Sequence, residues 1–166
     1  MTPNIITSVI DYCNAKGIPT AVDPKQKNFL AYKNCTLFKP NLKEVKEGLK
    51  ISVGDISVQN LNKVHTALNE SLQNVISFIT LSEHGVYFSD GKEQKLIPTH
   101  IRNISDVSGA GDTVIAVASL VYASSKNILL AAEISNIAGG MVCELVGTAP
   151  INKNDLAAEV AKLLTK

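Results

Sequence analysis

One short string gathers residue types that could do chemistry, running from Asp106 to Thr113 (DVSGAGDT). Its small residues at 108–111 would let backbone N–H groups approach a ligand closely, and the segment that follows, VIAVASLVYA, predicts a helix. The first turn of a helix presents free N–H groups and the positive end of the helix dipole, which together favour phosphate oxygens or an oxyanion. The string therefore predicts an anion-binding site at a helix N-terminus.

A carboxylate, Asp112, stands beside this predicted anion site. Its charge would repel a bound phosphate unless it serves a purpose there. One purpose is to accept a proton from a hydroxyl that then attacks a phosphoryl group held by the amides. The alternative is structural, because a first-turn acid complements the helix dipole and the glycines would then serve only the turn. The string by itself leaves both alternatives open.

The composition narrows the class of protein that could carry such a site. The chain has 166 residues, of which 45% are hydrophobic and 19% charged, and its net charge is +1 at pH 7. This apolar fraction is ample for a buried core and excludes a disordered chain. The balance of 16 basic and 15 acidic residues provides no electrostatic footprint for nucleic acid or for an anionic membrane. We therefore expect neither as a partner.

Cysteine usage and the N-terminal segment predict a cytoplasmic protein. The three cysteines, Cys13, Cys35 and Cys143, form no CxxC pair, which predicts reduced thiols. The longest apolar run, residues 114–123, is too short to span a bilayer. The first segment, MTPNIITSVIDYC, has neither the basic region nor the long apolar stretch of a signal peptide.

The apolar patterns predict the elements that must position the candidate residues. Helices are expected over residues 2–17, 57–72, about 112–124, 127–146 and 154–164, with a helical turn opened by Asn41. Short strands are expected over 18–22, 36–38, 74–80, 86–88 and 94–97, the last two flanking a hairpin turn at Asp90-Gly91. This order predicts one layered α/β domain over residues 1–166 with a mostly parallel sheet. Ligands of such sheets bind at the carboxyl ends of strands, so chemistry is expected just after residues 22, 38, 80 and 97.

Five segments, in order along the chain, resemble motifs of the ribokinase-like (PfkB) carbohydrate kinases. DVSGAGDTVIA is similar to their second signature, with Ser108 where relatives often carry Thr. The others are VDPK at 22–25, PNLKE at 40–44 for a PNxxE motif, TLSEHGV at 80–86 for a TxxxxG strand end, and the tail AAEISNIAGGMVCELVGTAPINKNDL. The set is most similar to heptose 7-phosphate kinases of the lipopolysaccharide-core pathway, part of ADP-heptose synthesis. The resemblance covers nearly the whole chain and implies a ribokinase-like layered α/β/α fold.

The resemblance implies transfer of the γ-phosphoryl group of ATP to a sugar hydroxyl, with heptose 7-phosphate converted to heptose 1,7-bisphosphate. Asp112 would be the catalytic base. The backbone N–H groups that would hold the transferring phosphoryl group are those of Gly109, Ala110 and Gly111. Asn41 and Glu44 would place Mg²⁺ through water. The alternative for this pair is helix capping at Asn41 and a solvated Glu44.

The same resemblance assigns further residues to ATP and to a second cation. Lys25 would contact a phosphate, although an exposed lysine is the ordinary alternative. The ribose and phosphates would be lined by Thr80, Ser82 and Gly85, and the adenine side by Asn136 and Gly140. Close helix packing at the glycine pair could coexist with that role. Asp106 and Gly147 would belong to a monovalent-cation loop, with K⁺ as the expected ion.

One departure from the family concerns length. The relatives are considerably longer, and the half that carries their glycine-rich first signature, much of the sugar pocket and the lid strands is absent from this sequence. We therefore expect the ATP-side part of the fold, truncated at its N-terminal side, with a homodimer or the missing half as partner. Two functions stay open, a sugar kinase for heptose 7-phosphate or another sugar, and a non-catalytic nucleotide-binding fragment.

Other enzyme classes lack their motifs in this chain. No GxGxxG follows a predicted strand, and neither GxxxxGK[ST] nor GxSxG occurs. The histidines have no metal-ligand spacing to a cysteine or to one another. We expect His65 on a solvated helix face, His84 in a loop and His100 at a strand end.

Overall fold

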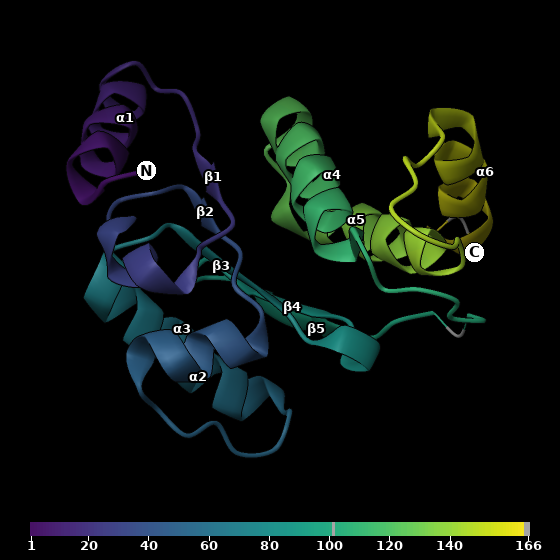
Figure 1. Ribbon diagram of the computed structural model, residues 1–166, viewed down its shortest axis with the longest axis horizontal. Helices are drawn as coiled ribbons and strands as arrows, with labels where there is room; N and C mark the ends of the chain where they lie inside the picture. The colour runs from purple at the N-terminus through teal and green to yellow at the C-terminus, as the bar shows by residue number, and fades with distance from the viewer. Residues whose placement is uncertain (101, 165–166) are drawn as a thin grey trace. The chain divides into compact units, whose positions relative to one another are not determined.

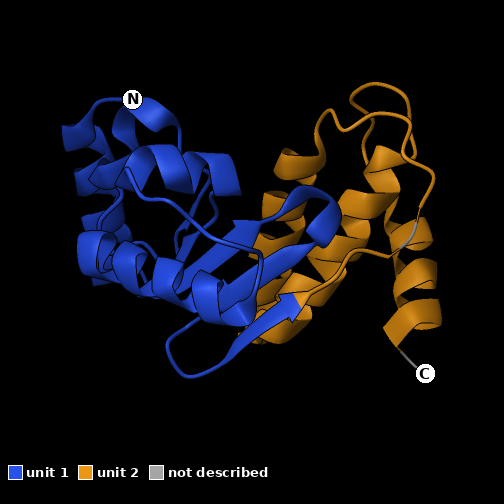
Figure 2. Cartoon of the chain, turned by 90° about the horizontal axis from the view of Figure 1, so that it is seen from below, with its two compact units in different colours: residues 1–96 blue, residues 97–166 orange. Residues whose placement is uncertain are grey.

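The computed structural model describes residues 1–100 and 102–164. The chain divides into two compact units, unit 1 (residues 1–96) and unit 2 (residues 97–166), which Figure 2 colours blue and orange. Each unit has its own buried residues and its own share of the predicted site residues. The assignment of residues 1–166 to a single kinase part stays a prediction.

The helices form close to where the sequence predicts them (Figure 1). Unit 1 contains α1 (Pro3–Ala15), η1 (Gln26–Ala31), α2 (Leu42–Leu49), α3 (Val58–Leu72) and η2 (Ser82–His84). Unit 2 contains α4 (Ala110–Ser125), α5 (Ile128–Cys143) and α6 (Lys153–Leu164). Local signals explain the starts: Pro3 occupies the first position of α1, and the Ser57 hydroxyl accepts the amide of Asn60 at 3.3 Å at the start of α3.

The five strands form one sheet in the order β1-β2-β3-β4-β5. Their bounds are β1 (Ala21–Val22), β2 (Leu37–Phe38), β3 (Ile76–Thr80), β4 (Val86–Ser89) and β5 (Gln94–Ile97). β1 pairs with β2 and β2 with β3 in parallel, whereas β3 pairs with β4 antiparallel. The turn at Asp90-Gly91 joins β4 to β5, and the Asp90 carboxylate accepts the amides of Lys92 and Glu93 at 2.9 and 2.7 Å. The predicted layered α/β class with parallel pairing is confirmed.

The strand expected over residues 18–22 is wrong for its first three residues. β1 contains only Ala21–Val22, and Pro19 before it has no N–H to donate to a sheet. Thr20 and Thr36 pair through their side chains instead. The Thr36 hydroxyl accepts the Thr20 amide at 3.0 Å, and the Thr20 hydroxyl accepts the Thr36 amide at 3.1 Å. The two segments are therefore joined here by side-chain hydroxyls, beside the backbone bond from the Leu37 amide to the Thr20 carbonyl at 2.9 Å.

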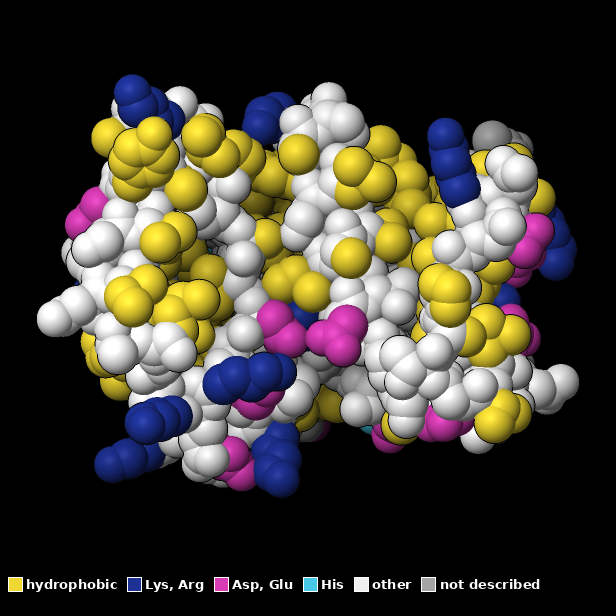
Figure 3. Space-filling model, turned by 45° about the horizontal axis from the view of Figure 1, so that its top comes forward, with side chains coloured by type: hydrophobic (Ala, Val, Ile, Leu, Met, Phe, Trp, Pro, Cys, Tyr) yellow, Lys and Arg dark blue, Asp and Glu magenta, His cyan; other side chains and the backbone are white. Residues whose placement is uncertain are grey.

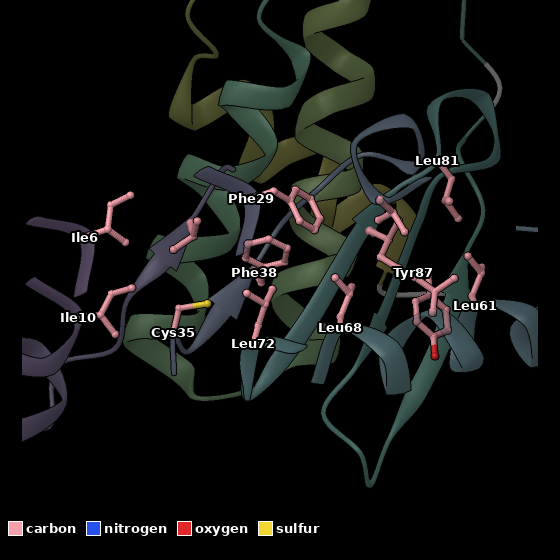
Figure 4. Packing of buried hydrophobic residues seen from close by; sticks show 14 residues of the cluster. Ile6, Ile10, Phe29, Cys35, Phe38, Leu61, Leu68, Leu72, Leu81 and Tyr87 are labelled. Carbon is pink, nitrogen blue, oxygen red and sulfur yellow. The ribbon is translucent and has the colours of Figure 1, made fainter. Parts of the chain in front are cut away.

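The core of unit 1 lies between the sheet and helices α1 to α3 (Figure 4). Phe29 of η1 meets Phe38 of β2 edge-on, with ring centroids 5.1 Å apart. The other large members of this cluster come from α1, α3, β3 and β4: Ile6, Ile10, Leu61, Leu68, Leu72, Ile79 and Tyr87. Burial of this apolar surface is the main force that fixes the strands, and with them the strand ends.

His65 corrects a prediction, because it lies on the buried face of α3 and is 7% exposed. It stands four residues after Leu61 and three before Leu68, on the face that enters the core. Its Nδ1 lies 2.9 Å from the Ser77 hydroxyl oxygen, which also accepts Nδ2 of Asn74 at 2.9 Å. A polar residue type on an apolar helical stripe is therefore a hydrogen-bonded core residue here, not a solvated one.

Unit 2 depends on close contact between α4 and α5. A Cβ at Gly139 of α5 would lie 2.6 Å from Cγ2 of Val114 and 3.9 Å from the carbonyl oxygen of Ala110. Glycine at this position lets α5 approach the first turn of α4. The packing alternative for the glycine pair is thus correct at Gly139, and it places α5 beside the start of α4.

The surface carries both charge signs on the face that Figure 3 shows, with apolar side chains between them. Within residues 1–100 and 102–164, every helix is too short or too polar to span a bilayer.

Candidate active site

Residues 106–112, named here the glycine loop, lead into α4. Gly109 is the N-cap of α4 and adopts the left-handed conformation, with φ 80° and ψ −4°. The Thr113 amide donates to the Gly109 carbonyl at 2.9 Å, which is the first bond of the helical ladder. The amides of Gly111 and Asp112 come before that bond and have no such partner among the described residues. The loop therefore ends in amides that are available to an anion.

Two details decide what the loop can bind. Of the three predicted amides, those of Gly109, Ala110 and Gly111, the Ala110 amide is directed to the Val107 carbonyl at 3.3 Å, so an anion would compete with that bond. A side chain at position 109 would be strained by the positive φ, and its Cβ would lie 3.2 Å from Cγ2 of Thr148. Gly109 is therefore needed for the turn, in agreement with the structural alternative. The same turn presents the amides of Gly111 and Asp112.

Asp106 organises the loop from its other end. Its Oδ1 accepts the Ser108 amide at 2.9 Å and its Oδ2 accepts the Gly147 amide at 3.0 Å. These bonds, the Ser108 bond first, hold the pKa of Asp106 below its ordinary value of 3.8. The structure thus brings together Asp106 and Gly147, the pair predicted for a monovalent-cation loop, and keeps a negative charge there. The cation itself stays a prediction.

Asp112 is exposed in the first turn of α4, where the amides of the glycine loop are presented. A carboxylate in this place can accept a proton from a hydroxyl group that approaches the same helix end. It also complements the helix dipole. The geometry is compatible with both roles, so its assignment as catalytic base stays a prediction.

Asn136 and Gly140 of α5 have structural partners. The Asn136 side chain, 7% exposed, donates through Nδ2 to the Pro98 carbonyl at 2.8 Å. Gly140 lies against Arg102, because a Cβ there would be 2.9 Å from its Nε. Asn136 and Gly140 are thus observed to contact Pro98 and Arg102, which precede the glycine loop. The assignment of Asn136 and Gly140 to the adenine side stays a prediction. Sequence reasoning missed Arg102, whose partners are far along the chain.

In unit 1, Asn41 and Glu44 form a reciprocal cap at the start of α2. The Asn41 Oδ1 accepts the Glu44 amide at 2.8 Å, and the Glu44 Oε2 accepts the Asn41 amide at 2.8 Å. Capping, the alternative weighed for Asn41, is therefore observed, and Glu44 takes part in it. The pair still fits a water-mediated magnesium ion, because a carboxylate and an amide oxygen are suitable ligands and Mg²⁺ retains several waters. Among the described residues no three acidic, histidine or cysteine side chains gather to hold a metal.

The turn after β3 brings three other predicted residues into one short loop. Thr80 ends β3 and its amide donates to the Pro40 carbonyl at 3.1 Å, which places it beside Asn41. Ser82 has a positive φ of 53°, and Gly85 has φ 90° and ψ −136°. The Gly85 amide donates to the Ser82 carbonyl at 3.1 Å, closing the loop. Thr80 and Asn41 thus share one edge of the sheet, as the carboxyl-end rule predicts.

Lys25 and Lys39 share one carboxylate, that of Asp23. Lys25, predicted to contact a phosphate, has a side chain 76% exposed and lies 3.5 Å from Oδ2 of Asp23. Lys39 is 4% exposed and lies 2.8 Å from Oδ1. Sequence reasoning passed over Lys39. The signal was available, because Lys39 directly follows a strand and precedes the Pro40-Asn41 motif.

Comparison with known proteins places this geometry in a family. The chain matches the pfkB family carbohydrate kinases over residues 2–155. It is 34% identical to Bifunctional protein HldE of Sulfurimonas denitrificans over 163 residues, which are 98% of this chain and 34% of the relative. It is 37% identical to Bifunctional protein HldE of Helicobacter hepaticus over 148 residues, which are 89% of this chain and 30% of the relative. The chain thus spans about a third of the length of these relatives.

Solved structures agree on the fold. Phosphofructokinase-2 from Escherichia coli in complex with potassium superposes with a TM-score of 0.87 at 18% identity, covering 100% of this chain and 54% of that one. Ribokinase from Thermotoga maritima superposes with a TM-score of 0.62 at 20% identity, covering 87% and 45%. The predicted ribokinase-like fold is confirmed. Together with the family match over residues 2–155, these findings show that the chain belongs to the pfkB family of carbohydrate kinases.

Proposed function

We propose that this chain is the ATP-side part of a sugar kinase that transfers the γ-phosphoryl group of ATP to a sugar hydroxyl. The observation that carries the proposal is the start of α4, where Gly109 is left-handed and the amides of Gly111 and Asp112 have no helical partner within the described part of the chain. Amides in this position stabilise the charge on a phosphoryl group in transfer. The exposed carboxylate of Asp112 takes the proton from the attacking hydroxyl as the new O–P bond forms and ADP leaves.

The proposal extends to the other predicted residues. Thr80, Ser82 and Gly85 line the nucleotide with Lys25, while Asn136 and Gly140 lie on its adenine side. Asn41 and Glu44 hold Mg²⁺ through water, and the bound ion would neutralise charge on the ATP phosphates. Asp106 and Gly147 belong to a loop for K⁺, and the ionised state of Asp106 supports a cation there.

Heptose 7-phosphate is the acceptor we propose, with heptose 1,7-bisphosphate as product and ADP-heptose and lipopolysaccharide-core synthesis as the setting in the cytoplasm. The motif resemblance supports this choice, as does the identity of 34–37% to proteins named HldE. A kinase for another sugar is the nearest alternative. Full activity would draw on a partner subunit or on the part of the relatives that this chain does not match.

The test is ADP release with Mg-ATP and heptose 7-phosphate, run beside Asp112→Asn. The substitution keeps size and hydrogen bonding but removes basicity, so turnover is expected to fall by about 10²–10⁴-fold while nucleotide affinity stays unchanged. Asp155→Asn is the matched control, because Asp155 is a first-turn acid of α6. Equal effects of the two substitutions would mean that Asp112 only complements its helix dipole.

A second candidate is a non-catalytic nucleotide-binding fragment. It is favoured by one observation, that the chain covers only 54% of a solved relative and about a third of the HldE relatives. Calorimetry with Mg-ATP separates the two candidates. Nucleotide binding without heptose-dependent turnover would support the fragment, and absence of both would contradict the proposed function.

A further inference from the structure

Arg102 lies on the segment between β5 and the glycine loop, and its side chain is only 10% exposed. Its Nη1 donates to Oε2 of Glu144 and its Nη2 to Oε1 of Glu159, both at 2.8 Å. Glu144 is the C-cap of α5, and Glu159 belongs to α6. A single guanidinium therefore joins this segment to two helices. Its bond to Glu159 also holds the pKa of that carboxyl below the ordinary 4.5.

The surface of α5 is shaped to receive this side chain. A Cβ at Gly140 would lie 2.9 Å from Nε and 3.0 Å from Cδ of Arg102. A side chain at this position would require the Arg102 side chain to shift. Gly140 and Arg102 therefore form one packing unit.

The same end of α5 holds the glycine loop. The amides of Ser105 and Asp106 both donate to the Cys143 carbonyl, at 2.8 and 3.1 Å. The residue after Cys143 is Glu144, the partner of Arg102. The Asp106 carboxylate then accepts the amides of Ser108 and Gly147. A shift of the last turn of α5 would therefore move the loop that presents the helix amides.

We propose that Arg102 is a positioning residue for phosphoryl transfer, which fixes the end of α5 through Glu144 and Glu159 and so sets the place of the glycine-loop amides. The inference rests on the proposed function. Arginine is required because its planar fork engages two carboxylates in fixed directions, whereas the lysine ammonium is a compact point charge on a flexible stem. Displacing reacting groups by about 1 Å is sufficient to cost about 10²-fold in rate.

The first test is Arg102→Lys in the full chain, which keeps the charge and loses the fork. Its kcat is expected to fall by about 10²-fold while KM for Mg-ATP changes by less than about 3-fold, because the lost contact acts on the transition state. The matched control is Ile128→Val, which removes a buried methyl group at the far end of α5, about 22 Å along the helix from Cys143. This control is expected to lower Tm with kcat unchanged. If Arg102→Lys behaves like this control, with a lower Tm and an unchanged kcat, the proposal is overturned.

A second readout does not depend on turnover. Amide hydrogen exchange at Ser105, Asp106 and Gly147 is expected to be about 10-fold or more faster in Arg102→Lys, and unchanged in Ile128→Val. Gly140→Ala is expected to give the same increase, with no further increase in the double variant, since both act on one guanidinium. If the wild-type chain shows no turnover, the proposed kinase fails, and exchange alone decides the positioning role. Unchanged exchange at these three amides would overturn it.

Discussion

The cap in unit 1 and the glycine loop in unit 2 are built in opposite ways. Asn41 and Glu44 satisfy each other across three residues, so both bonds of the cap lie within one turn of the chain. The glycine loop is held by distant partners instead. Asp106 is 41 residues from Gly147, and Arg102 is 57 residues from Glu159.

This difference between local and distant partners indicates which site should tolerate substitutions in the residues around it. A local cap forms whenever its helix forms, so the unit 1 cap should withstand loosening of the surrounding fold. The glycine loop has the right shape only while α5 and α6 are in place. Loss of a distant partner such as Glu144 or Glu159 is therefore expected to reach the glycine loop in unit 2, whereas the cap in unit 1 has no such partner to lose among its capping bonds.

The largest expected effect comes from breaking the buried ion pair between Lys39 and Asp23 in unit 1. Asp23→Asn leaves the ammonium of Lys39, 4% exposed, without its carboxylate, and the free energy of unfolding should fall by about 3 kcal/mol. Lys25→Met is the control, because the exposed Lys25 pairs with the same carboxylate and should contribute less than about 0.5 kcal/mol. Urea denaturation measures both. Equal losses would show that burial does not separate the two lysines.

A smaller effect is expected at the turn of the glycine loop. Gly109→Ala must place a side chain at a φ of 80° and 3.2 Å from Thr148, and we expect a loss of about 1–3 kcal/mol with weaker binding of Mg-ATP. Gly17→Ala in unit 1 meets a φ of 66° with no atom within 4 Å, so it tests the backbone contribution alone. Thermal unfolding of both variants separates the steric part. A larger loss for Gly17→Ala would contradict the role of Thr148.

The local cap should cost less to remove. Asn41→Ala deletes the acceptor of the Glu44 amide and should lower stability by about 1 kcal/mol, whereas Asn41→Asp should restore the cap. Asn127→Ala removes the cap of α5, which accepts the Leu130 amide at 2.9 Å, and serves as the comparison in unit 2. Both caps are local, and Asn127 lies at the end of α5 opposite Cys143, so amide exchange in the glycine loop should stay constant with either substitution. Faster exchange in the glycine loop of Asn41→Ala would show that the cap of unit 1 is not local.

The smallest expected effect is on the pH dependence of the unfolding free energy, which differs between the two units. Burial lowers the pKa of His65, and the Asp90 carboxylate partly opposes this. The unfolded state therefore binds a proton at His65 more readily than the folded state does. The contribution of His65 to the free energy of unfolding is present above pH 6.5, and it is lost as the pH falls from 6.5 toward the lowered folded pKa. In unit 2 the pKa of Glu159 is also lowered in the folded state. The stability that Glu159 contributes is therefore lost only below pH 4.5, as the pH falls through its folded pKa.

Denaturation of wild type and His65→Gln between about pH 5.5 and 7 checks this expectation. The slope of unfolding free energy against pH should flatten in His65→Gln. His84→Gln is the control, since the His84 side chain is 53% exposed. An unchanged slope in His65→Gln would remove His65 from the acid response of unit 1.

Much of the fold was predictable because its signals are local. Proline at the start of α1, Ser57 at the start of α3 and Asp90-Gly91 at the turn each act within a few residues. Other predictions failed because a distant contact decided the outcome. The hydroxyl of Thr36 takes the Thr20 amide beside β1, and the buried face of α3 includes His65 because Ser77 of β3 offers a partner. Pro19 is the exception, a local signal against the longer strand that the prediction did not weigh.

The sequence by itself determined the helix starts, the alternation of strands and helices, and the small residues at the entrance to α4, because each depends on backbone preferences of neighbours. It also identified Asp112 and Asn41 as candidates. Only the tertiary structure decided that Lys39 is buried and Lys25 exposed, and that Arg102 reaches two helices. Charge burial and long-range hydrogen bonds depend on what packs against a residue, and a linear pattern does not contain the position of residues that lie tens of positions away.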